Sequence, residues 1–340
     1  MINSEFRQDP VTGIWVIISE GRRSRPDELT QSNGRKQLPS YNPDCFFCPG
    51  NEDKTPPEIL AYRNGRIWWA RTIPNKFPAL SLEARVEGGP ELTREGMFVK
   101  KPGYGMHEVI IETPSHNQDI HSRPLDQIRE MLWMYRDRLM AYKNDKGLEN
   151  VLIFKNKGDS GGASLEHPHS QLTASPMHMQ MLDLEIQGAE RYFLSKNFMG
   201  KKGQCVYCDM TDQELENANR VIAENPSFVA FLPFASRFPF EAWILPKTHK
   251  SDYASISPEE ATYLAMMVKD IFHRLHRTLR DPDYNMILHT TPLNSGIQEY
   301  YHWHIEVIPR LTKIAGFELG AGNNINIVAP ERAAQFINTN

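Results

Sequence analysis

Apolar side chains recur at helical intervals in two stretches of the chain. They follow one another three or four residues apart along residues 125–142 and again along residues 261–275. This spacing puts them in one stripe on a helix surface, so it predicts two long helices, each packed by one face against a core. Short apolar runs at residues 151–154 and 286–288 are typical of strands. The stripe residues are Leu125, Ile128, Leu132, Tyr135, Leu139 and Tyr142 in the first helix and Ala261, Leu264, Val268, Ile271 and Leu275 in the second.

A third helical pattern lies between these two. Ser175 and Pro176 are typical of an N-cap and a first helical position, and apolar residues at positions 182, 186, 189 and 193 continue the periodicity. We expect a helix that begins there and ends in the segment from Gly200 to Gly203. This divides the chain into an N-terminal domain, residues 1–199, and a C-terminal domain, residues 200–340. From Asn323 onward no pattern predicts an element.

The two halves of the chain carry the same landmarks in the same order. Each contains a Cys-x-x-Cys pair, a Lys/Arg-Phe-Pro tripeptide, a glutamate eight residues before a histidine, a helix introduced by proline, a strand-like run and a His-x-His. Such an ordered repeat indicates two related domains. The first half is longer between residues 78 and 108, where glycines are frequent, and we interpret the excess as an inserted loop.

Composition and charge limit the class of partner. The apolar set makes 40% of the 340 residues and charged residues make 24%, as in globular proteins. The formal net charge of −4 gives no reason to expect nucleic acid or an anionic membrane as partner. No apolar run approaches the roughly 18 residues of a membrane span, and residues 1–10 lack the pattern of a signal peptide. We therefore expect a cytoplasmic protein.

The four cysteines form two Cys-x-x-Cys pairs, one in each half. Each pair is followed by histidines at matching places, and a tetrahedral zinc site takes two thiolates and two imidazoles of this kind. A redox pair of the thioredoxin type would follow a strand of a βαβ unit, which is absent here. His121 is a rival of His116 as ligand, and His289 or His304 of His302. The predicted zinc ligands are Cys45, Cys48, His116 and His167 in the first half and Cys205, Cys208, His249 and His302 in the second.

The segment of residues 156–171 carries the candidate chemistry. Its small residues would let the backbone approach a phosphate, and successive amides can cradle one. In the strand that follows, His167, His169 and Gln171 share one face because side chains alternate. If His167 binds zinc, His169 is held beside the loop and can attack phosphorus to form a phosphoramidate. Alternatively, His169 is a second metal ligand or a packed polar residue. The small-residue loop before it and Gln171 after it disfavour that interpretation.

These motifs resemble those of the galactose-1-phosphate uridylyltransferases of the histidine-triad superfamily. The resemblance lies in His-Pro-His-Ser-Gln, the preceding Asn-Lys-Gly and Gly-x-Ser, and the opening Asp-Pro-Val-Thr-Gly-Ile-Trp, and it covers nearly the whole chain. It implies an α+β fold of two tandem histidine-triad-like domains, each an antiparallel sheet with a crossing helix. It also implies that His169 becomes uridylylated, and that two chains form a homodimer. Substrate contacts are expected at Arg22, Arg25, Asn75, Asn156, Gly162, Ser164 and Gln171, with Phe317 and Glu318 meeting the sugar across the dimer interface.

The sequence departs from that family in its second half. The uridylyltransferases hold a metal there with a glutamate and histidines, a pattern that Glu185, His289, His302 and His304 could supply. The second Cys-x-x-Cys pair and the tail of residues 316–322 are similar instead to a sister branch that phosphorolyses ADP-glucose through the same histidine.

The sequence therefore predicts a nucleotidylyltransferase with two zinc ions per chain. We expect it to exchange UMP between UDP-glucose and galactose-1-phosphate by double displacement through His169, so its partners are a nucleotide sugar and a hexose-1-phosphate. The first competing hypothesis is adenylyl transfer from ADP-glucose. The second is a zinc-stabilised nucleotide-binding protein without catalysis.

Overall fold

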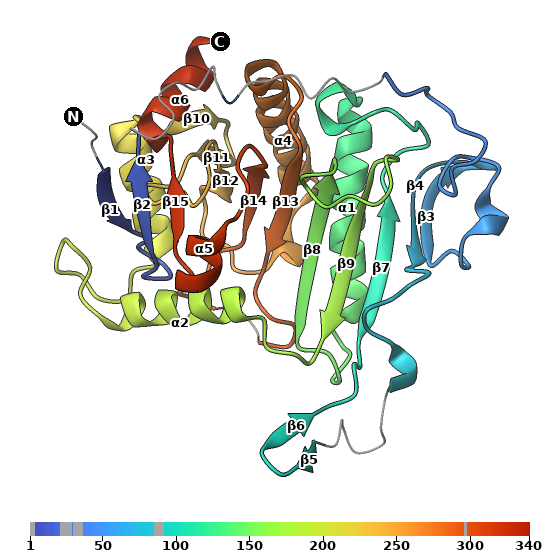
Figure 1. Ribbon diagram of the computed structural model, residues 1–340, viewed down its shortest axis with the longest axis horizontal. Helices are drawn as coiled ribbons and strands as arrows, with labels where there is room; N and C mark the ends of the chain where they lie inside the picture. Colours follow the sequence, from blue (N-terminus) through green and yellow to red (C-terminus); the bar gives the residue numbers. More distant parts are fainter. Residues whose placement is uncertain (1–3, 21–28, 30–36, 85–91, 296–297) are drawn as a thin grey trace.

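The computed structural model describes residues 4–20, 29, 37–84, 92–295 and 298–340. Ten strands form one continuous antiparallel sheet through the molecule (Figure 1). The order is β3-β4-β7-β9-β8 in the first half and β13-β14-β12-β11-β10 in the second, and the halves join where β8 pairs with β13. The strands are β3 (Leu60–Asn64), β4 (Ile67–Pro74), β7 (Met106–Ile111), β8 (Asn150–Lys157), β9 (His169–Ser175), β10 (Val221–Glu224), β11 (Phe228–Phe231), β12 (Ala242–Pro246), β13 (Tyr284–His289) and β14 (His304–Pro309).

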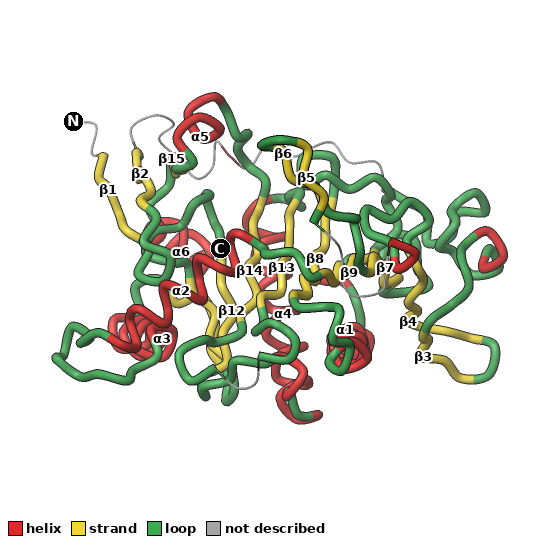
Figure 2. The backbone as a smooth tube through the Cα atoms, turned by 90° about the horizontal axis from the view of Figure 1, so that it is seen from below, coloured by secondary structure: helices red, strands yellow, loops and turns green. Residues whose placement is uncertain are grey.

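One long helix crosses each half on the same face of the sheet. These are α1 (Leu125–Tyr142) and α4 (Pro258–Leu279), and Figure 2 shows both on one side of the strands. The predicted stripes are buried in them, except that Leu125 at the start of α1 is half-buried. The two long helices and the strands β8 and β13 are thus confirmed. The α+β class is confirmed as well, with an antiparallel half-sheet and a crossing helix in each half, and the two half-sheets are joined into one through β8 and β13.

The two ends of the chain meet beside the second half. Strand β2 (Trp15–Ser19) pairs antiparallel with β1 (Ser4–Gln8) and parallel with β15 (Asn324–Asn326). The C-terminal helix α6 (Pro330–Thr339) follows, and the guanidinium of Arg7 lies 2.9 Å from the carboxylate of Glu331. The tail whose structure no pattern predicted therefore folds against the start of the chain.

The connecting helix α2 (Gln180–Leu194) begins later and ends earlier than expected. The prediction of a start at Ser175 is wrong because Ser175 pairs with Asn150 as the last residue of β9, and its hydroxyl accepts from the amide of Met177 in a tight turn. The helix also ends at Leu194, six residues before Gly200. It packs so closely on the N-terminal segment that a Cβ on Gly188 would lie 1.8 Å from a backbone oxygen, so only glycine fits there.

The excess length of the first half forms a separate arm. Its described part contains the hairpin of β5 (Thr93–Glu95) and β6 (Phe98–Lys100), which extends beyond the end of the sheet in Figure 1. Met97 and Phe98 at its tip are 84% and 73% exposed. Its glycines at positions 88 and 89 lie outside the described residues. The remaining elements are α3 (Val206–Asn217), α5 (Gly316–Ala321), η2 (Glu52–Lys54), η3 (Leu82–Ala84), η4 (Ile120–Ser122) and η5 (Tyr253–Ser255).

Among the described helices, none is both long and apolar enough to cross a membrane.

A buried ion cluster lies between the first-half sheet and α1. Glu112, just after β7, is fully buried and contacts Lys155 of β8 at 3.0 Å and Arg123 at 2.9 Å. It also accepts a hydrogen bond from Ser170, whose hydroxyl lies 2.5 Å from that of Tyr135 on α1. Burial by itself would raise the pKa of Glu112, but the two cations outweigh it and hold the pKa at about 2. The cluster therefore ties β7, β8, β9 and α1 together.

Replacing Glu112 by glutamine leaves Lys155 and Arg123 buried without their counter-charge. We expect the free energy of unfolding to fall by about 3–5 kcal/mol, as for other buried pairs that lose one partner. The exposed Glu83→Gln is the matched control and should change the urea midpoint little. Equal midpoints for the two variants would contradict a stabilising role of the cluster.

The carboxylate of Glu112 also makes the free energy of unfolding depend on pH. Its folded pKa of about 2 lies below the ordinary value of 4.5, so its contribution is complete above about pH 4.5 and is lost as pH falls toward 2. The shift corresponds to about 3 kcal/mol. Urea unfolding between pH 3 and pH 6 should therefore show a steeper acid loss for the unaltered chain than for Glu112→Gln.

Candidate active site

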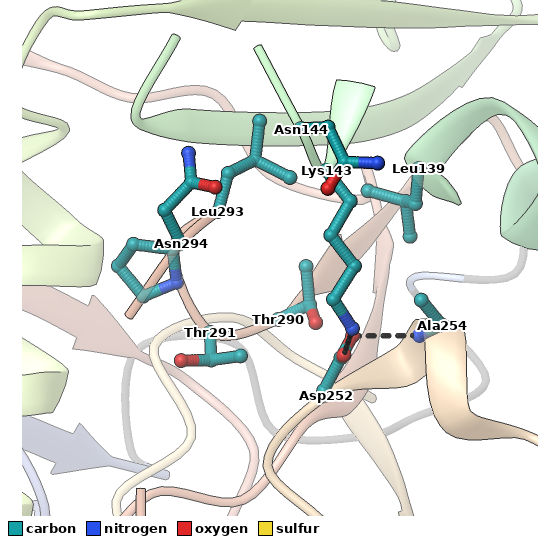
Figure 3. A pocket seen from close by; sticks show the side chains of 10 residues that line it. Leu139, Lys143, Asn144, Asp252, Ala254, Thr290, Thr291, Leu293 and Asn294 are labelled. Atoms are coloured by element: carbon teal, nitrogen blue, oxygen red, sulfur yellow. Dashed lines mark hydrogen bonds and ion pairs between the residues drawn. The ribbon is translucent and has the colours of Figure 1, made fainter. Parts of the chain in front are cut away.

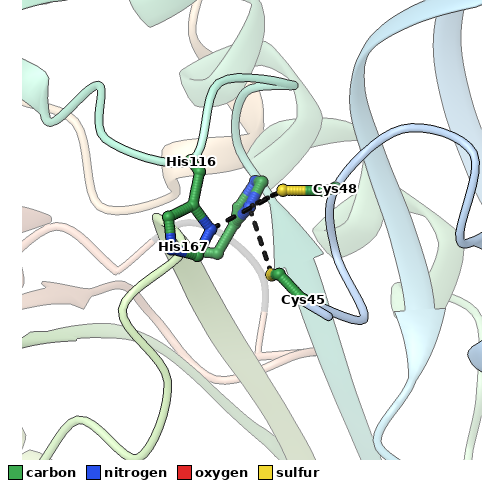
Figure 4. A group of neighbouring side chains, drawn as sticks. All are labelled: Cys45, Cys48, His116 and His167. Carbon is green, nitrogen blue, oxygen red and sulfur yellow. Dashed lines mark hydrogen bonds between the residues drawn. The ribbon is translucent and has the colours of Figure 1, made fainter. Parts of the chain in front are cut away.

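The first Cys/His set comes together beyond the end of β7 and the start of β9, two neighbouring interior strands of the sheet. Cys45 and Cys48 lie in one turn, His116 follows β7 and His167 precedes β9 (Figure 4). Nδ1 of His167 lies 3.6 Å from both sulfurs, and Nδ1 of His116 lies 3.6 Å from Sγ of Cys48. The ring Nε2 of His167 donates to the carbonyl of Thr113 at 2.8 Å. Its Nδ1 is then unprotonated and faces the thiols.

These distances fit a tetrahedral zinc. With Zn–S near 2.3 Å and Zn–N near 2.0–2.1 Å, tetrahedral angles put sulfur and nitrogen about 3.6 Å apart. A histidine ligand also normally donates its other ring nitrogen to a carbonyl, as His167 does. The four side chains therefore have the identity, spacing and orientation that a structural zinc site requires.

The second half repeats this arrangement. Cys205 caps α3, Cys208 lies in its first turn, His249 follows β12 and His302 precedes β14. Sγ of Cys208 lies 3.4 Å from Nδ1 of His249 and 3.7 Å from Nδ1 of His302. The structure thus brings together both predicted ligand sets, each at the same place in the repeat.

The rival histidines lie elsewhere. His121 contacts His276, and Nδ1 of His289 lies 2.8 Å from Glu185. The alternative set of a glutamate with three histidines is not formed, because His302 faces Cys208. Its other members, Glu185, His289 and His304, form a separate buried group with Glu306.

His169 begins β9 immediately beyond the first Cys/His set. Its Nδ1 lies 2.8 Å from the carbonyl oxygen of His167, and since a carbonyl can only accept, Nδ1 carries the proton and Nε2 has a free lone pair. Burial lowers the pKa of His169 below 6.5, so the ring is neutral at pH 7. Phe47, inside the Cys-x-x-Cys turn, packs against the ring with centroids 5.4 Å apart.

Side-chain alternation sends His169 and Gln171 to the face of the sheet opposite α1. Ser170, between them, bonds to Tyr135 of that helix. Asn156 shares the face with Gln171, because Phe154, two residues before it on β8, pairs directly with Gln171. Figure 2 shows that no long helix covers this side, where α5 and the β5–β6 hairpin lie.

Sequence reasoning missed His107, which joins two of the predicted residues. The backbone amide of Ala79 donates to its Nδ1 at 3.1 Å, so Nε2 carries the proton. Nε2 lies 2.8 Å from Oε1 of Gln171, so this oxygen accepts a hydrogen bond from His107. The side-chain nitrogen Nδ2 of Asn75 lies 3.2 Å from the same Nε2. The amino group of Gln171 is thereby turned away from His107. A lone histidine without a motif gives no signal from which this contact could be predicted.

The loop between β8 and His167 differs from the expected phosphate cradle. The amide of Ser160 donates to Asp283, that of Gly162 to Asp159 and that of Ala163 to Gly158. These three amides already have acceptors within the protein, so they do not present an open cradle in this structure. Gly161 is needed for packing, since a Cβ there would lie 2.3 Å from a backbone oxygen.

The other predicted contacts lie apart from His169 or outside the described residues. Arg22 and Arg25 are not described. Gly162, with φ of +79°, and Ser164 lie on the exposed part of the loop. Phe317 on α5 is 45% exposed, and Glu318 accepts from the amide at the start of its own helix at 3.0 Å. Within the described residues, no hydrogen bond or ring contact joins α5 to His169.

A pocket of about 290 Å³ lies on the side of the long helices, between the end of α1, η5 and the segment after β13 (Figure 3). An ion pair of 2.7 Å between Lys143 and Asp252 crosses it. None of the predicted site residues lines this pocket, so it is separate from the face that carries His169.

Each half of the chain repeats one antiparallel sheet, one long helix and one Cys/His set, and comparison with known proteins gives the family. The sequence-family model of the galactose-1-phosphate uridyl transferase N-terminal domain matches residues 1–178. The family model of the C-terminal domain matches residues 185–338. The chain belongs to the galactose-1-phosphate uridyl transferase family.

Its relatives include enzymes of two specificities. An ADP-glucose phosphorylase of Arabidopsis thaliana is 33% identical over 335 residues, covering 97% of this chain and 91% of the relative. A galactose-1-phosphate uridylyltransferase of Thermotoga maritima is 28% identical, covering 97% and 96%. A crystal structure of the Arabidopsis phosphorylase with bound ADP-glucose superposes with a TM-score of 0.82 at 31% identity, covering 99% of both chains.

Metal analysis tests the two Cys/His sets. We expect two zinc ions per purified chain, and Cys48→Ser and Cys205→Ser should each lose one. A structural zinc contributes on the order of 10 kcal/mol to folding, so each variant should also melt earlier. The exposed His178→Gln serves as control and should keep both ions. Unchanged zinc content in both cysteine variants would contradict the assignment.

Proposed function

We propose that the chain transfers a nucleotidyl group through a covalent intermediate on His169. The observation that carries the proposal is the hydrogen bond from His169 Nδ1 to the carbonyl of His167, which leaves Nε2 unprotonated. The lowered pKa supports it as well, because a neutral imidazole is the nucleophilic form. Zinc in the first Cys/His set would fix the backbone that supplies this carbonyl.

The reaction has two displacements at the α-phosphorus of a nucleoside diphosphate sugar. Nε2 attacks, the bond from phosphorus to the bridging oxygen breaks, and hexose-1-phosphate leaves with the electron pair. The phosphorylated ring then carries a positive charge, which the carbonyl of His167 stabilises through the Nδ1 proton. An oxyanion acceptor next attacks the same phosphorus, and the nitrogen recovers its electron pair.

Gln171 would stabilise charge on the phosphoryl oxygens. His107 holds Oε1 of this residue, so its amino group is the part that can donate to substrate. Asn75, beside the same histidine, would add a second amide donor. The other predicted substrate contacts, Arg22, Arg25, Asn156, Gly162, Ser164, Phe317 and Glu318, remain part of this proposal, the last two through a homodimer.

For the donor we favour ADP-glucose, with inorganic phosphate as acceptor. Supporting this is the similarity to an ADP-glucose phosphorylase at 33% identity, together with the second Cys/His set. The products would be ADP and glucose-1-phosphate. The UMP exchange between UDP-glucose and galactose-1-phosphate expected from the sequence is the second candidate, supported by relatives such as the 28% identical enzyme of Thermotoga maritima.

Initial rates distinguish the two donors. We expect phosphate-dependent release of glucose-1-phosphate from ADP-glucose to be faster than UMP transfer from UDP-glucose to galactose-1-phosphate, with parallel lines in double-reciprocal plots in either case. Faster uridylyl transfer would reverse the donor assignment and leave His169 as nucleophile. Converging lines would count against double displacement itself.

His169→Asn removes the nucleophile and keeps a side chain of similar polarity. We expect turnover to fall by at least about 10⁴-fold, as for other lost nucleophiles, while nucleotide-sugar binding by calorimetry stays within a few-fold. Full activity of this variant would rule out His169 as nucleophile, and loss of binding without loss of fold would favour a purely structural role.

His107→Ala frees the amide of Gln171 to rotate. We expect kcat to fall by about 10²-fold, the effect of a misplaced catalytic group, with KM little changed. In His107→Gln an amide can still donate to Oε1, so part of kcat should return. If His107→Ala keeps the original kcat, the amide of Gln171 is not oriented by this contact.

A further inference from the structure

In both halves, the aromatic residue directly before the second cysteine of the Cys-x-x-Cys pair packs against the second histidine of the His-x-His. In the first half this residue is Phe47, whose ring centroid lies 5.4 Å from that of His169. In the second half it is Tyr207, whose ring centroid lies 5.3 Å from that of His304. The contact is therefore a feature of the repeat, and in the first half it reaches the residue that we propose as nucleophile.

Phe47 is itself held in place by its surroundings. Its side chain is 7% exposed and belongs to a small buried cluster that includes Ile73 of β4 and Ile111 of β7. Its backbone amide donates to Sγ of Cys45 at 3.4 Å, which fixes the chain on the other side of the ring. The ring of Phe47 is thus a rigid wall beside the imidazole of His169.

The hydrogen bond from His169 to the carbonyl of His167 sets the tautomer but does not by itself fix how the ring is turned, because the outer torsion of a histidine side chain has no sharp preference. Phe47 meets the ring with the two planes at 67°, an edge-on contact that aromatic pairs favour. In the second half, Trp243 also stacks on His304 at 4.9 Å. Among the described residues no second aromatic ring contacts His169, so its orientation depends on Phe47.

We propose that Phe47 is a positioning residue, which holds the imidazole of His169 in the orientation for attack on phosphorus. The inference rests on the proposed function, in which Nε2 of His169 is the nucleophile. Because Phe47 fills the space between the ring and the Cys-x-x-Cys turn, His169 cannot swing toward that turn. A displacement of a reacting atom by about 1 Å lowers the rate by about 10²-fold.

The kinetic test removes the contact and leaves the hydrogen bond of His169 in place. In Phe47→Ala we expect kcat, measured with the faster of the two donors, to fall by about 10²-fold, with KM for the nucleotide sugar changed by no more than a few-fold. Phe47→Leu keeps an apolar side chain of intermediate size, so part of the lost kcat should return.

Two matched controls separate positioning from loss of packing. Ile73→Ala truncates a side chain of the same buried cluster, and Tyr207→Leu removes the equivalent contact in the second half. Both should lower the melting temperature, as core truncations do, and both should keep kcat within about threefold of the unaltered chain, far from the 10²-fold loss of a misplaced group.

The ¹⁵N resonances of the His169 imidazole give a readout that needs no turnover. They are assigned by their absence from His169→Asn and recorded at a pH where the ring is neutral. In the unaltered chain and in Ile73→Ala they should show a single form protonated on Nδ1. In Phe47→Ala they should broaden or move toward the average of the two tautomers, because the ring is free to turn.

Equal kcat values for Phe47→Ala and Ile73→Ala would overturn the proposal, as would an unchanged imidazole spectrum in Phe47→Ala. Loss of a zinc equivalent from Phe47→Ala in elemental analysis would also overturn it, because Phe47 would then serve the Cys/His set. Activity that persists in His169→Asn would instead defeat the proposed function, and the spectrum would still decide whether Phe47 holds the ring.

Discussion

The hydrogen bond between Nδ1 of His169 and the carbonyl of His167 is the contact on which the candidate active site depends. The same residue that supplies this carbonyl has its own ring against Cys45 and Cys48. Two residues further along, the strand turns His169 to the sheet face opposite α1 with its tautomer already fixed. In the proposed reaction, the backbone held at His167 would orient His169 as the nucleophile.

Equivalent positions of the repeat have different neighbours in the two halves. His304 begins β14 as His169 begins β9, and Glu306 stands where Gln171 stands. In the second half Trp243 stacks on His304 at 4.9 Å, and Arg237 binds Glu306 at 2.6 Å. Trp243 and Arg237 are thus the neighbours of His304 and Glu306, whereas Phe47 and His107 contact His169 and Gln171 in the first half. In the second half, His304 and Glu306 belong to a buried polar group with Glu185 and His289.

The sequence predicted those features that follow from the periodicity of apolar residues or from the spacing of cysteines and histidines. The stripes of α1 and α4 follow from their period, and the two Cys/His sets follow from the repeat, although the spacing alone left rival histidines open in both sets. The start of α2 could not be predicted, because Ser175 serves equally as a helix cap or as the last residue of a strand, and pairing with β8 decides between them. The pairing of β15 with β2 joins residues more than three hundred positions apart, which no local pattern reports.

The same distinction holds inside the site. His169 was recognisable from its motif, whereas His107 acts through contacts to Ala79 and Gln171 that exist only once β7 and β9 are paired. The internal bonds of the amides in the loop after β8 could not be predicted, because small residues suit both a phosphate cradle and tight internal turns. Which use prevails is decided by acceptors such as Asp283, which comes from the other half.

Isolation of the covalent intermediate tests the central claim most directly. The chain is mixed with ADP-glucose or UDP-glucose without acceptor, quenched in base, where a phosphoramidate survives, and analysed by peptide mass spectrometry. We predict one nucleotidyl group on His169, lost on acid treatment and absent from His169→Asn. A modification on any other residue, or turnover with no adduct at all, would contradict the account.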